Sequence, residues 1–364
     1  MINNKTIAVV IPAFNEENQI GLVLENIPDF VDRIIVVNDC STDNTAQIIK
    51  NFMLKLGSLK LPERNIQDNS SSFYNKANEI IEQWNKEEIK YFAPAQVFHD
   101  NSDQRLVIIN LLKNSGVGGA IARGYKWAKD NNIDCTAVMA GDGQMDPSEL
   151  FSICNPVVSD SVDYVKGDRL GHKSAKILMP RKRFIGNSIL SLLTKIASGY
   201  WHISDTQTGY TAISNRALNK IDLYKIYPKY GMPNDMLVKL NIENCTLKEV
   251  PIKPIYFIGE QSKMKIRKVI PRISWLLTRS FFKRIWVKYL RKSFHPLFIL
   301  YHMGIILLLI SIPFGIKILM KIFAHSDANP VTVLAFALLF ISGFQSLMFA
   351  MWMDIQDNQR LNKD

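Results

Sequence analysis

The sequence predicts a mostly parallel α/β domain, followed by a basic segment and a pair of membrane-spanning helices. From residue 6 to about residue 255, short β-branched runs alternate with helical patterns, which is typical of an α/β sheet. The mean hydropathy is 0.00, and the apolar residues concentrate in residues 296–320 and 331–353. Each stretch is long enough to cross a hydrocarbon core, for which about 20 apolar residues suffice.

The composition excludes several other classes of protein. With 47% hydrophobic and 21% charged residues among 364, the chain is neither disordered nor collagen-like. Its four cysteines are scattered and form no CxxC pair, which favours reduced thiols over a disulfide framework or a zinc site. The apolar run at residues 7–11 is too short for the core of a signal peptide. We therefore expect the bulk of the chain to lie in the cytosol.

Four predicted strands end in polar or glycine-rich turns. These strands are residues 7–11, 33–37, 106–112 and 136–140. Open α/β sheets bind ligands at the carboxyl ends of their strands, so we expect the four turns to converge on one site. Later in the domain we predict helices at residues 183–199 and 232–242, and strands at residues 208–214 and 247–252.

The predicted α/β domain covers residues 1–262, with one interruption. Residues 51–104 break the alternation of strands and helices, although residues 75–90 have a charged, helical pattern. This segment is longer than a normal connection, so we predict an insertion or flap and assign it no chemistry.

Residues 263–295 form a basic segment without Asp or Glu. Its lysines and arginines equal in number the whole net charge of +11. A basic belt beside a membrane span is attracted to anionic lipids and marks the cytoplasmic side, whereas nucleic acid is not an expected partner. In the first half, three cations share one helical face and three apolar residues lie roughly opposite, as in an interfacial helix: Arg272, Arg279 and Lys283 against Ile273, Leu277 and Phe281. The cations in the second half of the segment lie on a different side of the helix, so we expect the helix to bend or break there.

The two apolar stretches within residues 296–353 predict a transmembrane hairpin. The turn between them, residues 323–330, is short, so both ends of the hairpin are expected in the cytoplasm. Residues 354–364 then form a predicted cytoplasmic tail. The spans are expected to act mainly as a tether; they also offer a surface for a homo-oligomer, and the sequence leaves the oligomeric state open.

Asp142 and Gln144 directly follow a predicted strand and are candidate metal ligands. Two oxygen-bearing side chains at this spacing can bind a hard divalent cation, which completes its shell with water and substrate phosphates. The alternative is an ordinary Asx turn, in which Gly143 supplies a positive φ and Asp146 caps the next helix.

Two other turns carry candidate ligand-binding groups. Asp39, Ser41 and Asp43 either hydrogen-bond a base or ribose or cap the following helix. Residues 116–119 open a helix, where they either face an anion or form a tight turn with close helix packing. The dinucleotide fingerprint would have a third glycine where Ile121 stands, which disfavours a Rossmann oxidoreductase.

Three cations downstream of these turns are candidate phosphate ligands: Arg169, Arg183 and Lys263. Solvation at the surface is the simpler explanation for any single one of them. The sequence contains no HExxH, GxSxG or Walker A motif, which disfavours zinc hydrolysis, α/β-hydrolase chemistry and P-loop NTP hydrolysis.

Several motifs in order resemble the family 2 glycosyltransferases. They are VIPAFNEE at residues 10–17, VNDCSTDNT at 37–45, NSGVGGA at 114–120 and GDGQMDP at 141–147. A later series resembles the polyprenyl-phosphate branch, which contains the dolichol-phosphate mannose and glucose synthases. It comprises GDR at residues 167–169, DTQTGY at 205–210 and GEQSK at 259–263.

The resemblance implies a GT-A fold. It also implies inverting transfer of a hexose-type sugar from a nucleotide diphosphate sugar to a dolichyl or undecaprenyl phosphate. The donor nucleotide would contact residues near the first two strands: Pro12, Phe14, Glu16, Asn38 and Asp39.

The resemblance further implies that Asp142 and Gln144 bind Mg²⁺ or Mn²⁺. Arg169, Arg183 and Lys263 would complete the catalytic centre around Asp142. The sequence does not name the sugar, the nucleotide or the polyprenol.

Two alternatives stay open at this point. A phosphate monoester is largely dianionic near pH 7, because its second pKa is about 6, and needs no general base. Transfer to a diacylglycerol or glycolipid hydroxyl would need one, such as Asp205 or Asp235. The alternative of another class is a catalytically inactive membrane scaffold, against which the retained candidate residues argue.

Overall fold

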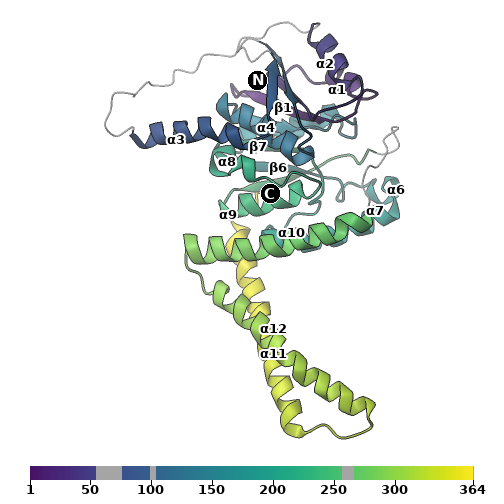
Figure 1. The fold of residues 1–364 in the computed structure, drawn as a ribbon, viewed down its shortest axis with the longest axis vertical. Coiled ribbons are helices and arrows are strands. Elements are labelled where there is room, and N and C mark those ends of the chain that lie inside the picture. Colours follow the sequence, from purple (N-terminus) through teal and green to yellow (C-terminus); the bar gives the residue numbers. More distant parts are fainter. Residues whose placement is uncertain (55–75, 99–103, 256–265, 364) are drawn as a thin grey trace.

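A computed structural model describes residues 1–54, 76–98, 104–255 and 266–363. It shows an α/β domain from which a hairpin of two long helices projects (Figure 1). Within these residues the domain is built on an eight-stranded sheet of order β3-β4-β2-β1-β5-β7-β6-β8. The strands are β1 (Ile7–Ala13), β2 (Arg33–Asn38), β3 (Ala95–Phe98), β4 (Leu106–Leu111), β5 (Cys135–Val138), β6 (Tyr164–Asp168), β7 (Thr211–Ser214) and β8 (Leu247–Pro251).

The centre of the sheet is parallel and confirms the predicted fold class. β1 pairs in parallel with β2 and β5, β2 with β4, and β6 with β8. β7 runs antiparallel to both of its neighbours, and β3 antiparallel to β4. The strands that were predicted from the sequence begin or end within a few residues of the observed ones, whereas β3 and β6 were not predicted.

Helices bury both faces of the sheet. α4 (Val117–Asp130), α8 (Asn215–Lys220) and α9 (Met232–Ile242) cover one face, and α1 (Ile20–Glu25), α2 (Thr45–Met53) and α5 (Leu150–Ser159) cover the other. Residues of β1 alternate between the two cores, with Ala8 and Val10 in the first and Val9 and Ile11 in the second. Because both faces are covered, β1 is apolar throughout.

Part of the predicted insertion belongs to the domain. It contributes α3 (Lys76–Glu87), a 3₁₀ turn (Glu88–Tyr91) and the edge strand β3, while residues 55–75 and 99–103 lie outside the described residues. Glu88 is buried, pairs with Lys129 of α4 at 3.2 Å, and accepts a hydrogen bond from the Leu223 amide at 3.2 Å. These contacts of Glu88 fix the chain that follows α3 against α4 and the Leu223 turn.

A layer of helices closes the domain on the side of the hairpin (Figure 1). It contains α6 (Ala175–Leu178), α7 (Arg181–Ser198) and α10 (Ile266–Trp286), and α10 continues as a π-helical stretch, Val287–Lys292. Where the sequence predicts a bend, the helix changes from α-helical to π-helical geometry at Val287.

The prediction for the apolar face of α10 was wrong. Ile273 and Leu277 are buried against Ala197 of α7, with Phe281 packed beside them, so these residues face the domain and not a bilayer. The exposed apolar residues of α10 include Trp275, Phe282 and Trp286, which lie elsewhere on its circumference. Periodicity alone does not distinguish a protein partner from a lipid one.

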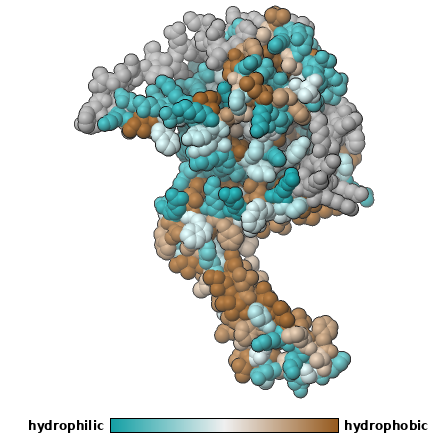
Figure 2. All heavy atoms as spheres, viewed as in Figure 1, coloured by the Kyte–Doolittle hydropathy of each residue, from teal (hydrophilic) through white to brown (hydrophobic). Residues whose placement is uncertain are grey.

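Two helices among the described residues are long and apolar enough to cross a membrane: α11 (Leu297–Phe323) and α12 (Pro330–Gln359), with hydropathies of 2.3 and 2.0. They pack along one another, and their surface is predominantly apolar (Figure 2). A Cβ on Gly304 would lie 3.0 Å from the Gly343 carbonyl oxygen, so glycine permits the close approach.

The end of α12 differs from the predicted cytoplasmic tail. Asp354, Asn358 and Leu361 are buried in the domain. The Leu247 amide of β8 donates to the Leu361 carbonyl at 2.8 Å, and the Lys363 amide donates to the Leu247 carbonyl at 2.9 Å. Residues 354–363 are thus an integral part of the α/β domain.

Candidate functional site

The turns after β1 and β2 are joined by hydrogen bonds. Asn15 and Cys40 both adopt positive φ, 55° and 62°, where the chain turns sharply out of each strand. The Asn15 amide donates to Ser41 Oγ at 3.1 Å, and the Thr42 amide donates to Asn15 Oδ1 at 2.9 Å. These contacts bring the two turns that carry the predicted nucleotide-binding residues together.

Asp39 links the turn after β2 to the turn after β4. Its buried carboxylate accepts hydrogen bonds from the Ser115 amide at 2.6 Å, Ser115 Oγ at 3.0 Å and the Gly116 amide at 2.8 Å. Burial raises the pKa of Asp39, and these hydrogen bonds oppose the increase. Its neighbour Asn38 is also buried and donates to Asn110 Oδ1 at 3.0 Å. Asp39 therefore holds the neighbouring turn in place, and Asn38 links the end of β2 to β4.

The glycine-rich start of α4 forms a tight turn. The Gly116 amide is used by Asp39, and the Gly118 amide donates to the Pro228 carbonyl at 2.9 Å. A Cβ on Gly118 would lie 2.1 Å from the Tyr227 carbonyl oxygen. Of the two interpretations of this motif, the contacts support close helix packing.

The turn with Asp142 and Gln144 lies beside the turn after β1. A Cβ on Gly141 would lie 3.2 Å from the Pro12 carbonyl oxygen. Asp142 Oδ1 accepts a hydrogen bond from the Gln144 amide at 3.1 Å, and Gly143 has a φ of 76°. The Asx turn is therefore present.

The donor set fits a hard cation with few protein ligands. Asp142 and Gln144 are half-buried and carry oxygen atoms suited to Mg²⁺ or Mn²⁺. Within the described part of the chain, no three His, Cys, Asp or Glu residues gather as a metal-binding group. A cation here would take its other ligands from water and from phosphate oxygens.

Arg169 forms a bidentate ion pair with Asp205. Its Nε lies 2.7 Å from Oδ2, and its Nη2 lies 3.3 Å from Oδ1. Asp205 is fully buried; burial opposes its charge, but the Arg169 guanidinium outweighs that effect and lowers the pKa of Asp205. This pair joins the GDR and DTQTGY motifs.

Two further ionisable groups lie beside this pair. Lys166 is fully buried, donates to the Thr208 carbonyl at 2.5 Å, and has a pKa that burial lowers to about 8. Glu249 accepts hydrogen bonds from the Ser204 and Asp205 amides at 2.8 and 3.1 Å, and burial raises its pKa to about 7. Neither group was predicted from the sequence. For Glu249 the available signal was an ionisable residue inside a predicted strand, whereas β6, which contains Lys166, was not predicted as a strand.

The remaining predicted residues are located as follows. Pro12 and Glu16 are half-buried, Phe14 is exposed, and Arg183 lies in the first turn of α7. Lys263 lies outside the described residues.

A hollow of about 290 Å³ opens between the Arg169 loop and α7. Hydroxyl groups, Lys195 and two leucine side chains line it: Leu170, Gly171, Ser188, Ser191, Leu192, Lys195 and Ser204.

Both carboxylates considered as a general base are already engaged. Asp205 is paired with Arg169, as described above. Asp235 is buried, pairs with Lys239, and accepts a hydrogen bond from the Tyr227 amide at 2.8 Å. Neither arrangement suits proton abstraction from a hydroxyl.

Residues 8–80 and 86–222, more than half of the chain, match the family described as Glycosyl transferase family 2. The chain belongs to this family. Together with the sheet topology, the match confirms the predicted GT-A fold and glycosyltransferase class.

Relatives with named functions are similar over much of the chain. The UDP-N-acetylglucosamine–dolichyl-phosphate N-acetylglucosaminyltransferase of Methanococcus voltae is 29% identical over 254 residues, which cover 70% of this chain and 87% of that protein. The undecaprenyl-phosphate mannosyltransferase of Micrococcus luteus is 28% identical over 163 residues, which cover 44% of this chain and 66% of that protein.

Solved structures show a more distant likeness. Glucosyl-3-phosphoglycerate synthase from Mycobacterium tuberculosis, in complex with Mn²⁺, uridine diphosphate and glucosyl-3-phosphoglycerate, superposes with a TM-score of 0.45 at 16% identity. The superposition covers 77% of this chain and 80% of that one.

Proposed function

We propose that this protein transfers a hexose-type sugar from a nucleotide diphosphate sugar to a polyprenyl phosphate, with inversion at the anomeric carbon. The observation that carries the proposal is a family 2 domain packed directly on two helices apolar enough to cross a bilayer. A polyprenyl phosphate keeps its tail in the hydrocarbon of the bilayer and presents its anionic head at the bilayer surface, beside the domain. The names of the Methanococcus and Micrococcus relatives support this acceptor class.

The surface of α10 supports a domain that rests on the membrane. Its exposed residues interleave aromatic and cationic side chains, which suits the boundary between headgroups and hydrocarbon. They include Arg272, Trp275, Arg279, Phe282, Lys283 and Trp286. In Figure 1, α10 lies across the base of the domain where the hairpin leaves it. Placement on the cytoplasmic side, contact with anionic lipids and self-association through the spans stay predictions.

The donor would bind at the joined turns. Pro12, Phe14 and Glu16 would border the nucleotide, while Asn38 and Asp39 would hold the turns that shape its site. Asp142 and Gln144 would hold Mg²⁺ or Mn²⁺. A bound divalent cation neutralises charge on the departing nucleotide diphosphate.

The acceptor phosphate would need cations rather than a base. Its oxygen attacks C1 of the sugar as the bond from C1 to the diphosphate oxygen breaks, so no proton has to be removed. Arg169, with Arg183 and Lys263, would reduce repulsion between the two anionic substrates. The two carboxylates considered as a base for a hydroxyl acceptor, Asp205 and Asp235, are both held in ion pairs, which disfavours that alternative.

Product analysis tests this function. The full chain in lipid vesicles is given labelled nucleotide sugars together with a phosphorylated polyprenol. We expect a chloroform-soluble labelled product that is absent when the polyprenol is dephosphorylated. Label recovered on diacylglycerol, with none on the polyprenyl phosphate, would overturn the proposal.

A further inference from the structure

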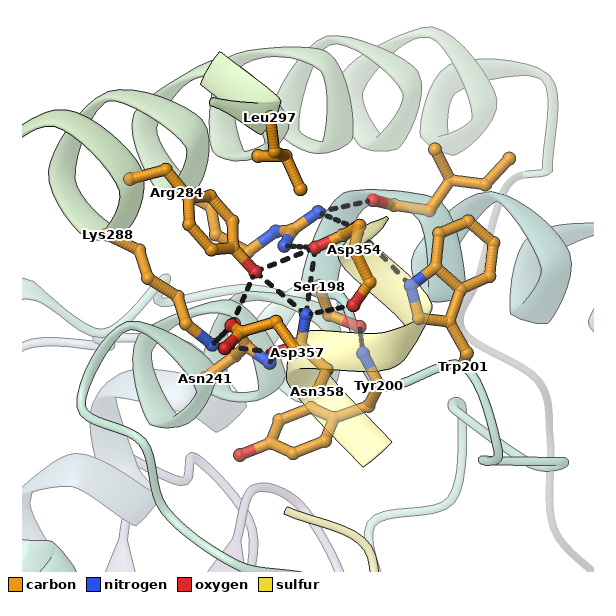
Figure 3. A network of polar contacts seen from close by, with 12 residues as sticks. Ser198, Tyr200, Trp201, Asn241, Arg284, Lys288, Leu297, Asp354, Asp357 and Asn358 are labelled. Carbon is orange, nitrogen blue, oxygen red and sulfur yellow. Dashed lines mark hydrogen bonds and ion pairs between the residues drawn. The ribbon is translucent and has the colours of Figure 1, made fainter. Parts of the chain in front are cut away.

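The last turns of α12 end in a buried polar network (Figure 3). Asp354 is fully buried, and each of its carboxylate oxygens accepts from Arg284 of α10, at 2.7 and 2.8 Å. Tyr289 Oη donates to Asp354 Oδ1 at 2.8 Å, and Trp201 Nε1 donates to Oδ2 at 3.3 Å. A carboxylate near the end of a membrane helix is thus fully enclosed by the α/β domain.

A second layer of contacts extends the network. Lys288 is buried and donates to Asn358 Oδ1 at 2.6 Å and to Asn241 Oδ1 of α9 at 3.0 Å. Asn358 also donates to Asp354 Oδ1 at 2.8 Å. Arg284 and Lys288 are therefore committed inside the protein and are not available to lipid headgroups.

Arg284 connects this network to α7. Its Nε donates to the Ala197 carbonyl at 3.0 Å, and its Nη2 donates to the Ile196 carbonyl at 3.1 Å. These carbonyls lie in the last turn of α7. Carbonyls in the last turn of a helix have no backbone N–H partner within that helix, so Arg284 supplies the missing donors. The guanidinium also lies on Gly199, since a Cβ there would be 2.6 Å from Nη1.

α7 carries candidate acceptor-binding groups along its length. Arg183 lies in its first turn, and Ser188, Ser191 and Lys195 line the hollow beside the Arg169 loop. The position of α7 relative to the hairpin therefore sets the height of these groups above the bilayer. The chain of contacts runs from α12 through Asp354 and Arg284 to the end of α7.

We propose that Arg284 and Asp354 are positioning residues that hold α7 at a fixed height above the membrane hairpin for transfer to a lipid acceptor. The inference rests on the proposed function. A long polyprenyl phosphate is held by its tail, so its head stays at the bilayer surface and α7 must meet it there. A short, water-soluble prenyl phosphate diffuses to α7 wherever α7 lies.

The test compares these two acceptors in the full chain carrying Arg284→Lys. Lysine keeps the charge opposite Asp354 but cannot also reach both α7 carbonyls. We expect the KM for long-chain polyprenyl phosphate in vesicles to rise about tenfold, with the KM for a two-isoprene phosphate and for the donor within about twofold of wild type. Arg216→Lys, at the Arg216–Asp163 pair whose Nε–Oδ1 distance is 2.8 Å, is the matched control and should behave as wild type.

Hydrogen exchange separates this inference from the proposed function. Amides in residues 194–200 should exchange at least tenfold faster in Arg284→Lys than in wild type or Arg216→Lys, whatever the enzyme's acceptor. If Arg284→Lys does not fold, Asp354→Asn removes the counter-ion of the guanidinium and should give the same pattern. Equal KM changes for both acceptors, or unchanged exchange, would overturn the positioning role; wild type that transfers to no prenyl phosphate would overturn the proposed function instead.

Discussion

Asp142 is the residue whose replacement tests the metal site most directly. Asp142→Ala removes one of two oxygen-bearing side chains in the turn after β5, and Gln144 remains. Because one lost electrostatic contact to a developing charge costs about 10²–10³ in rate, we expect turnover to fall by that factor under saturating Mn²⁺ or Mg²⁺. Near-normal turnover would contradict the assignment. The control is Asp160→Ala, which removes an exposed carboxylate paired with Lys248 at 3.3 Å and should retain wild-type turnover.

The raised pKa of Glu249 leads us to expect that the stability of the domain depends on pH. Burial raises its pKa to about 7 in the folded chain, whereas the unfolded chain has the ordinary value of 4.5. Between these values the folded state binds more protons than the unfolded state, so the contribution of Glu249 is full below pH 4.5 and is lost as the pH rises to 7.

Thermal unfolding at several pH values checks this sign. Glu249→Gln cannot titrate, so its melting temperature should decrease less than that of wild type between pH 5 and pH 7.5. The exposed Glu25 of α1 offers the matched control, Glu25→Gln. A wild-type slope retained in Glu249→Gln would exclude Glu249 as the source.

At the scale of elements, apolar pattern predicts strands well and helix partners poorly. β1, β2 and β4 were predicted nearly to the residue because continuous apolar runs mark strands buried on both faces. In α10 the same kind of pattern identified Ile273 and Leu277 as one face but could not tell that α7 covers it. Exposed residues of that helix, Trp275 among them, became evident only from the packing.

Two glycines in helices predict opposite effects of the same substitution. Gly118→Ala would place a methyl group 2.1 Å from the Tyr227 carbonyl oxygen and should lower the free energy of unfolding by about 1–3 kcal/mol. Gly186→Ala, in α7, meets nothing within 4 Å and should raise it by up to about 1 kcal/mol, because alanine favours helix. Paired denaturation curves in detergent measure both. Equal effects would show that the α4 turn is not tightly packed.

At the scale of the whole molecule, the sequence could predict the two units but not their connection. The hairpin follows from composition, and the catalytic domain from strand pattern and ordered motifs. The ion pair between Arg284 and Asp354 joins residues far apart in the chain, and nothing local distinguishes Arg284 from the exposed Arg279. Burial of a charge depends on its partner, which only the folded arrangement supplies.

Truncation of the C-terminal residues tests whether they form a free tail or an integral part of the domain. Removal of a free tail leaves the melting temperature unchanged, whereas removal of an integral segment lowers it. A stop codon after Met353 leaves both apolar stretches nearly intact but removes Asp354, Asn358 and Leu361. Arg284 then stays buried without its counter-ion, a loss worth about 3–5 kcal/mol in comparable buried pairs. We expect the apparent melting temperature in detergent to fall by about 5 °C or more. A stop codon after Lys363, which removes Asp364 alone, should leave it unchanged; if both truncations melt like the full chain, residues 354–363 do not support the domain.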